Sequence, residues 1–293
     1  MRAIQYFLGL AAVAVLTCGL SGSLGGERAF AESERVAANG SARRIVAVYR
    51  VEIAGFNLGN FHLTANFNGS NYEMRGKARF SILDGLIYEW QGTTLSRGKV
   101  TRSGPKPAMY ALSYRGGKKV EQLRITFGGG AVTKVRIVPK KRPSPHTIPV
   151  TKEQLEGVFD PMSGAFLYAR SDNPNGDLNV CRQTVPVFDG KQRFDLVLTP
   201  KKLVRVKADR KSDYSGPAAV CRVKFIPIAG YRPDNPGIRL MSKSDEIEVW
   251  LVPLRGTGMY VPYRIVIPTP IGYGSALATS FRVTGAKRAS IEP

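Results

Sequence analysis

The sequence predicts a mostly β protein in which one long, curved antiparallel sheet, a half-barrel or β-spiral, wraps around one central helix. Three observations lead to this prediction. Apolar and polar residues alternate over most of the chain from residue 45, the pattern of strands with one buried face. Glycine and proline, 31 and 19 residues in number, separate almost all of these alternating runs. A single segment near the middle shows helical spacing instead.

The first half of the domain is predicted to be a meander of about six strands. In the first run, Tyr49, Val51 and Ile53 fall on one face. The next run, 61–67, places its apolar residues on one face and ends at an Asn-Gly turn sequence. About six further runs follow Cys181, again divided by glycine and proline. One continuous sheet is the expected arrangement, and two sheets that meet at the middle segment are the alternative.

The middle segment, residues 139–171, interrupts the alternation. Its first part, 139–149, is rich in proline and reads as a linker or long loop. Asp160 and Pro161 then match the N-cap and first position of a helix. Met162 and Phe166 follow with alanines at helical spacing, so we predict a helix over 161–171 that covers part of the apolar face of the sheet.

The N-terminus has the three parts of a secretory signal peptide. Arg2 is followed by an apolar stretch over 4–20, and Ala29-Phe30-Ala31 provides a cleavage pattern. We expect export with cleavage after about Ala31. An uncleaved membrane anchor is one alternative, and a lipoprotein anchored at Cys18 is a weaker one. Residues 32–44 read as a flexible lead, and residues 45–293 as a single β-rich domain.

The chain is strongly basic, with 43 Lys and Arg against 22 Asp and Glu and a net charge of +21. An exported basic protein has anionic membrane head groups, lipopolysaccharide and acidic polymers as neighbours. We expect no nucleic-acid partner, because the sequence has no helix-turn-helix or zinc-finger spacing. Basic residues concentrate in two runs, at 134–142 and 201–211. Within them we select as contacts to an anionic surface Lys140, Lys141, Arg142, Lys201 and Lys202. A solubilising charged face is the simpler interpretation of both runs.

Cysteine usage points to a disulfide rather than to a catalytic thiol. Only Cys181 and Cys221 follow the predicted cleavage site, and two cysteines in an oxidising compartment most simply pair with each other. The bond would close a loop of about 40 residues and stabilise the fold by about 4 kcal/mol in the chain-entropy model. Arg182 next to Cys181 would suit a reactive thiolate, but a disulfide removes that thiol.

The remaining candidate chemistry has structural explanations. An Asp-Gly sequence at Asp189 lies between two alternating runs and predicts a hairpin turn. Asp195 falls on the polar face of the following strand, and Asp160 serves as a cap. The only histidines, His62 and His146, have no metal-ligand spacing to other residues. We therefore expect a non-enzymatic protein without catalytic residues, cofactor or metal.

Four stretches carry a resemblance to a known family: "VYRVEIAGFNLGNFHLTANF", "DGLIYEWQGTTLSRGKV", "VFDPMSGAFLYAR" and "VPVFDGKQRFDLVL". The Asp-Pro-x-Ser and Phe-Asp-Gly motifs within them are the most specific. The chain resembles, over most of residues 45–255, the uncharacterised Gram-negative envelope family known as domain of unknown function 3108. The resemblance implies a periplasmic location and a β-rich plan like the half-barrels of lipoprotein carriers, which hold acyl chains around a helical plug. The plan is also similar to that of the envelope-integrity β-spiral proteins of alphaproteobacteria. The family supplies no catalytic residues.

These observations predict a periplasmic cell-envelope protein that binds a lipid, a lipoprotein or a hydrophobic peptide on the apolar concave face of its sheet. The residues selected for this face are Phe61, Leu63, Phe67, Trp90, Phe166 and Trp250. Each of them taken singly suits plain core packing equally well. The alternative is an envelope-integrity scaffold with a filled core that contacts protein or peptidoglycan. A hydrolase of envelope polymers is less favoured, because no carboxylate pair stands out.

Overall fold

The computed structural model describes residues 43–82, 88–101, 104–117, 119–140, 144–169, 173, 176–254 and 257–285. The predicted signal peptide and residues 32–42 of the predicted lead lie outside these ranges. Arg43 and Arg44, which we assigned to the lead, instead begin the first strand. Among the described helices, none has the length and apolar character needed to cross a membrane.

The described chain forms one sheet of fourteen antiparallel strands. The strands are β1 (Arg43–Ile53), β2 (Phe56–Asn68), β3 (Asn71–Ile82), β4 (Tyr88–Thr101), β5 (Gly104–Gly116), β6 (Lys119–Gly128), β7 (Ala131–Val138), β8 (Leu167–Tyr168), β9 (Gln183–Phe188), β10 (Arg193–Val206), β11 (Gly216–Ala229), β12 (Glu248–Leu254), β13 (Met259–Thr269) and β14 (Gly272–Thr284).

The two halves of the chain form separate runs of this sheet. Strands β1 to β7 follow one another as a meander, and so do β9 to β14. The runs join where β1 pairs with β14, with Tyr49 opposite Ala278, and β7 and β9 are left at the two edges. The short strand β8 pairs only with β13. The prediction of one long, open antiparallel sheet is therefore confirmed, and the two-sheet alternative is wrong.

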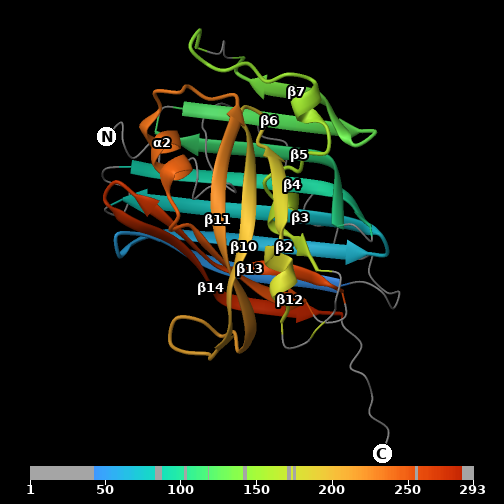
Figure 1. The fold of residues 1–293 in the computed structure, drawn as a ribbon, viewed down its shortest axis with the longest axis vertical. Coiled ribbons are helices and arrows are strands. Elements are labelled where there is room, and N and C mark those ends of the chain that lie inside the picture. Colours follow the sequence, from blue (N-terminus) through green and yellow to red (C-terminus); the bar gives the residue numbers. More distant parts are fainter. Residues whose placement is uncertain are drawn as a thin grey trace, which may run out of the picture.

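The sheet folds back over itself and encloses its core. In Figure 1, β9 to β11 run upright in front of β2 to β6, which run across the page. A large sheet with one apolar face must curl in this way to bury that face. The main core cluster accordingly joins Trp90 and Tyr110 of the first half to Val261 and Tyr263 of the second.

A hairpin turn holds the β9–β10 part of the second half against β6. Asp189 Oδ1 accepts hydrogen bonds from the backbone N–H groups of Lys191 and Gln192, at 2.7 and 2.6 Å, as an Asp-Gly hairpin turn requires. Lys191 Nζ forms an ion pair with the fully buried Glu121 of β6. The predicted hairpin is confirmed, and its turn also joins two strands far apart in the sheet.

The helix predicted over 161–171 is wrong. The segment forms a single 3-10 turn, η4 (Ser163–Ala165), and Phe166 then returns to extended backbone with φ −95° and ψ 99°. Leu167 and Tyr168 pair with β13 as strand β8. Asp160 Oδ1 accepts hydrogen bonds from the N–H groups of Met162 and Ser163, but the N-cap residue of η4 is Met162 and not Asp160 as predicted. A short isolated helix is marginal, and pairing with β13 satisfies the next backbone groups instead. Residues 170 and 171 lie outside the described residues.

The α-helix of the described chain is α2 (Pro236–Lys243). It begins at Asn235, whose side chain accepts hydrogen bonds from the N–H groups of Gly237 and Ile238. Ile238 and Met241 are buried in the second core cluster, and the helix contacts β11 and β13. The sequence pattern missed this helix because it has only eight residues, too few to show clear periodicity.

Candidate functional site

The structure packs five of the six predicted ligand-face residues into the interior. Phe61, Leu63, Phe67, Trp90 and Phe166 belong to one core cluster, and none of these residues is more than 9 % exposed. The rings of Phe67 and Phe166 lie 6.0 Å apart, so the 158–169 segment does cover the apolar face although it is not a helix. These contacts are those of a packed core.

Trp250 packs against the same cluster but is less deeply buried than the other five. It is partly exposed on β12, and the Arg264 guanidinium lies 5.6 Å from the centre of its ring. Trp250 lines a groove of about 770 Å³, the second groove. That groove carries mixed charge, because its lining includes Lys201, Arg222 and Arg264 together with Glu52, Asp245, Glu246 and Glu248.

A larger groove, the basic trough, lies on the outer face of β2 to β7, opposite the core. Its volume is about 1200 Å³. Basic side chains line it from two sides: Arg75, Lys77 and Arg79 on β3, and Arg124 on β6 with Arg136 on β7. None of the described residues that line the trough is an Asp or a Glu. A concave surface of one charge favours ligands of the opposite charge.

The register of the strands explains the shape of the trough. One row of paired residues crosses the sheet as Arg75, Leu95, Ala111, Arg124 and Arg136. The next row on the same face places Thr93 and Ser113 between Lys77 and Gln122. Side chains on β4 and β5 are thus short where those on β3 and on β6–β7 are long and cationic. The short residues form a floor, and the basic residues form two walls.

Ion pairs hold part of the β3 wall in place. Arg75 Nε lies 2.7 Å from Glu73 Oε1, and Arg97 Nε lies 2.6 Å from the other oxygen of Glu73. Burial opposes ionisation of Glu73, but hydrogen bonds from the two arginines outweigh it and lower its pKa. Arg79 pairs with Glu89 at 2.7 Å. The β3 wall therefore contains two arginines that are already oriented by neighbours.

The other wall has unbalanced positive charge. Arg124 and Arg136 lie directly opposite each other across β6 and β7, and both are exposed. Within the described part of the chain, neither of them has a carboxylate partner, and nor does Lys77 on the β3 wall. Like charges directly opposite each other destabilise a strand pair, so this arrangement favours a bound anion.

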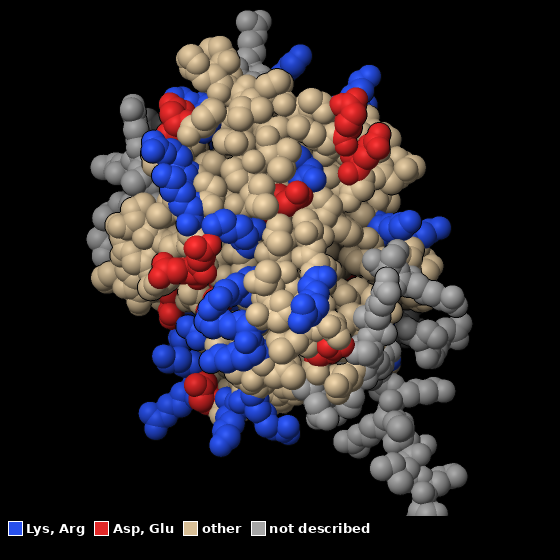
Figure 2. Space-filling model, viewed as in Figure 1, with Lys and Arg blue, Asp and Glu red and all other residues tan. Residues whose placement is uncertain are grey.

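The basic residues selected from the sequence lie elsewhere. Lys140 is exposed after β7, and Lys201 and Lys202 are exposed on β10, where Lys201 pairs with Glu248. Lys141 and Arg142 lie outside the described residues. Figure 2 shows basic side chains gathered over the lower part of the molecule, where Figure 1 places the hairpin between β10 and β11.

Sequence reasoning missed most of the trough. Arg136 belonged to a predicted basic run, but the wall on β3 did not. A signal was present, since Arg75, Lys77 and Arg79 occupy alternate positions and must share one face of a strand. What the sequence could not supply was the register that places Arg124 in the same row as Arg75.

A buried polar network surrounds Asp160. Its Oδ2 accepts hydrogen bonds from the hydroxyls of Ser163, at 2.7 Å, and of Ser96 on β4, at 2.9 Å. Its Oδ1 accepts from the N–H groups of Met162 and Ser163, at 2.9 and 3.1 Å. Burial raises the pKa of this carboxyl, and the four hydrogen bonds oppose the rise. The network joins the 158–169 segment to β4, which is a structural role.

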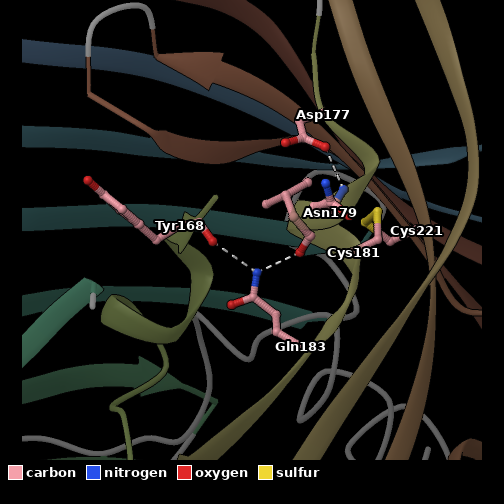
Figure 3. Close-up of a disulfide and its surroundings, with 7 residues drawn as sticks. Tyr168, Asp177, Asn179, Cys181, Gln183 and Cys221 are labelled. Atoms are coloured by element: carbon pink, nitrogen blue, oxygen red, sulfur yellow. Dashed lines mark hydrogen bonds between the residues drawn. A yellow bond between two sulfur atoms is a disulfide. The ribbon is translucent and has the colours of Figure 1, made fainter. Parts of the chain in front are cut away.

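The cysteines form the predicted disulfide. Cys181 ends the 3-10 turn η5 (Leu178–Cys181), and Cys221 lies on β11, with the two Cα atoms 5.3 Å apart. Figure 3 shows how the turn is held: Asp177 accepts a hydrogen bond from the Asn179 N–H, and Gln183 Nε2 donates to the carbonyls of Val180 and Tyr168. Because both sulfurs are bonded, neither cysteine is a free nucleophile.

The other carboxylates also have structural partners. Asp195 Oδ1 lies 2.5 Å from Arg193 Nη1 on the same strand. Asp189 is engaged by the hairpin turn, and burial raises its pKa although the turn N–H groups and Lys191 oppose the rise. Within the described ranges, no group of three or more His, Cys, Asp or Glu side chains has the arrangement of a metal site.

The fold and the trough define an open antiparallel sheet protein with a packed interior and a basic groove on its outer face. The chain belongs to the family described as Protein of unknown function (DUF3108), whose model matches residues 48–279. This confirms the resemblance noted in the sequence. A crystal structure of a beta-barrel-like protein of domain of unknown function DUF1849 from Brucella abortus is similar with 10% identity and a TM-score of 0.45, over 85% of this chain and 100% of that one. No curated protein matches the chain.

Proposed function

We propose that this protein is a non-enzymatic component of the periplasm that binds anionic material of the cell envelope on the outer face of its sheet. The observation that carries the proposal is the basic trough, a groove of about 1200 Å³ with two basic walls and no acidic residue in its described lining. Its interior serves as a hydrophobic core that keeps the sheet curved.

Packing of the core supports the scaffold alternative over a lipid carrier. A carrier needs apolar residues that line an accessible cavity. The side chains of Phe61, Phe67 and Trp90 instead belong to one buried cluster, in which Phe67 contacts Phe166 of the 158–169 segment. Binding at the outer face leaves this core undisturbed.

Two further observations support the proposed export and the proposed non-enzymatic role. The predicted signal peptide and the disulfide between Cys181 and Cys221 both suit an oxidising compartment outside the cytoplasm. Three carboxylates were weighed as catalytic candidates in the sequence, and each has a structural partner. Asp160 accepts a hydrogen bond from the Met162 N–H, Asp189 accepts one in the hairpin turn, and Asp195 forms an ion pair with Arg193.

Vesicle co-sedimentation tests the proposal. The exported chain should sediment with vesicles that contain anionic envelope lipids, and not with neutral phosphatidylcholine vesicles. Binding should weaken as salt is raised, because screening shortens the range of the attraction. Failure to bind anionic lipids or acidic envelope polymers, together with micromolar binding of a fluorescent fatty acid, would favour the carrier instead.

A second candidate function is peripheral contact with a membrane surface. Phe56, Ile271 and Tyr273 are 75, 63 and 53 % exposed, respectively. They belong to two adjacent hairpin ends, since the Ala54 N–H donates to the Tyr273 carbonyl at 2.9 Å. Apolar and aromatic side chains that protrude together suit the interfacial region of a bilayer.

Replacing Phe56 and Ile271 by serine tests this second candidate. Binding to anionic vesicles should fall severalfold if these side chains enter the bilayer, while thermal stability stays unchanged because both are exposed. Equal vesicle binding by the variant and the original chain would remove the membrane role of the hairpin ends.

A further inference from the structure

We propose that the basic trough binds the head group of a glycolipid that carries a phosphate at each end of a disaccharide. The proposal rests on the proposed function and names the ligand of the same site. It follows from the spacing of the two walls, from their charges and from the residues between them.

The spacing of the walls calls for two separated anionic groups. Strands β3 and β6 are three positions apart in the sheet. Neighbouring strands lie 4.7–4.9 Å apart, so the walls are about 14 Å apart at the level of the backbone. Two anionic groups separated by about this distance would each meet the side chains of one wall. Two sugar rings between two phosphates have a length of this order.

The charges of the walls suit phosphate in particular. Arg124 and Arg136 lie opposite each other and repel, and a phosphate between them would accept hydrogen bonds from both guanidinium groups. On the other wall, Arg75 is already held by Glu73, and Lys77 lies in the neighbouring row of the same strand. Each wall can therefore offer two cationic side chains to one phosphate.

The floor of the trough suits a sugar. Thr93 and Ser113 present hydroxyls between the walls, and Gln122 continues the same row with an amide. Leu95 and Ala111 form the neighbouring row, an apolar strip on which the face of a sugar ring can lie. The polar row could bind the hydroxyl groups at the edge of a pyranose ring, and the apolar row could contact the C–H groups on its face.

Two other basic surfaces within the described residues lack these features. Lys202 and Arg205 on β10 are exposed but do not line the trough or the second groove. The second groove contains Lys201 and Arg264, but four carboxylates line it as well. The described lining of the trough thus combines a concave shape with basic side chains and no carboxylate, while Glu73 and Glu89 beside it pair with Arg75 and Arg79.

The test compares two lipids that differ by one phosphate. Phosphatidylcholine vesicles would contain lipid A, a disaccharide with a phosphate on each sugar, or monophosphoryl lipid A. Phosphatidylglycerol vesicles of matched charge would control for general attraction to anions. We expect the exported chain to bind lipid A about tenfold more tightly than either, because only lipid A reaches both walls.

Variants of each wall separate this model from general attraction. Lys77→Gln with Arg75→Gln changes the β3 wall, and Arg124→Gln with Arg136→Gln changes the other. Each pair should lower lipid A affinity about tenfold, to the level of the monophosphoryl lipid. The matched control, Lys202→Gln with Arg205→Gln, removes the same charge elsewhere and should change affinity less than twofold. Five of the six residues are exposed and Arg75 is half-exposed, and the thermal melt of each variant checks its folding.

The outcomes distinguish the two proposals. Equal affinity for lipid A and monophosphoryl lipid A would overturn the two-phosphate model, and so would wall variants that lose no more affinity than the control. In either case, binding to anionic vesicles would still support the proposed function. Absence of binding to every anionic vesicle and acidic polymer would overturn both. If inorganic phosphate at the same concentration as lipid A displaced the protein from lipid A vesicles, a single anion would be enough for binding. That result would also overturn the two-phosphate model.

Discussion

At the scale of single residues, the buried Asp160 explains why the Asp-Pro-x-Ser motif has a structural effect beyond a helix start. Its carboxylate holds the backbone of Met162 and Ser163 and reaches across to Ser96 on β4. The same side chain therefore shapes a turn and fixes that turn to the sheet. Burying a carboxyl costs free energy unless its hydrogen bonds are satisfied, and here four hydrogen bonds satisfy it.

The free energy of unfolding should depend less on pH in the Asp160→Asn variant than in the original chain. The pKa of Asp160 is raised above its ordinary value of 3.8 by burial. The folded protein therefore binds this proton more tightly than the unfolded chain does. The stabilisation from the proton is complete below about pH 4 and is lost as pH rises through the folded pKa, at up to about 1.4 kcal/mol per pH unit.

Urea unfolding of both proteins across this range measures the difference. The free energy of unfolding of the original chain, relative to Asp160→Asn, should fall as pH rises from 4. A difference that rises with pH would mean that the carboxylate is the favoured form. Asp160→Ala should lose about 3 kcal/mol or more at any pH, because buried donors lose their acceptor.

Gly190 is a second residue whose role depends on tertiary contact. Its φ is +98°, and an added Cβ would collide with the side chain of Leu123 on β6. Gly190→Ala should therefore lower the free energy of unfolding by about 3 kcal/mol, from backbone strain and overpacking together. Gly69→Ala is the matched control, since Gly69 has φ +55° and open space around it. The control should lose only about 1 kcal/mol. Equal losses in chemical denaturation would show that the turn does not press on β6.

At the scale of elements, the 158–169 segment shows how tertiary pairing replaces local preference. Its apolar spacing and its Asp-Pro start both indicated a helix, and Asp160 does accept hydrogen bonds from the N–H groups of Met162 and Ser163. The helix did not continue, because β13 offered Leu167 and Tyr168 strand partners. Apolar residues at helical spacing still reached the core, since Met162 and Phe166 are both buried.

The disulfide joins the turn η5 to β11 and should be a large single contribution to stability. Its cysteines are 40 positions apart, which gives about 4 kcal/mol as an upper value in the chain-entropy model. Reduced and oxidised protein should differ by up to this amount in denaturant. Thiol titration of unreduced, denatured protein that lacks residues 1–31 should detect no free thiol. Two reactive thiols per chain would contradict the disulfide and make a catalytic Cys181 worth testing again.

At the scale of the whole molecule, curvature separates two faces with different roles. The inner face packs against the other half of the sheet and holds the aromatic residues that suggested a lipid site. The outer face of β2 to β7 carries the basic trough. A strand pattern places alternate residues on opposite faces, so one run such as 73–79 contributes to both the core and the trough.

The sequence by itself determined the fold class, the hairpin at Asp189, the disulfide and the apolar face, because alternation, turn residues and paired cysteines are local or compositional signals. Only the tertiary structure decided where the helix lies, how the sheet folds onto itself and which basic residues share a groove. Arg75 and Arg124 are far apart in the sequence and carry no mutual signal. They face the same trough because strand pairing sets the register across β4 and β5, and that register exists only once the sheet has formed.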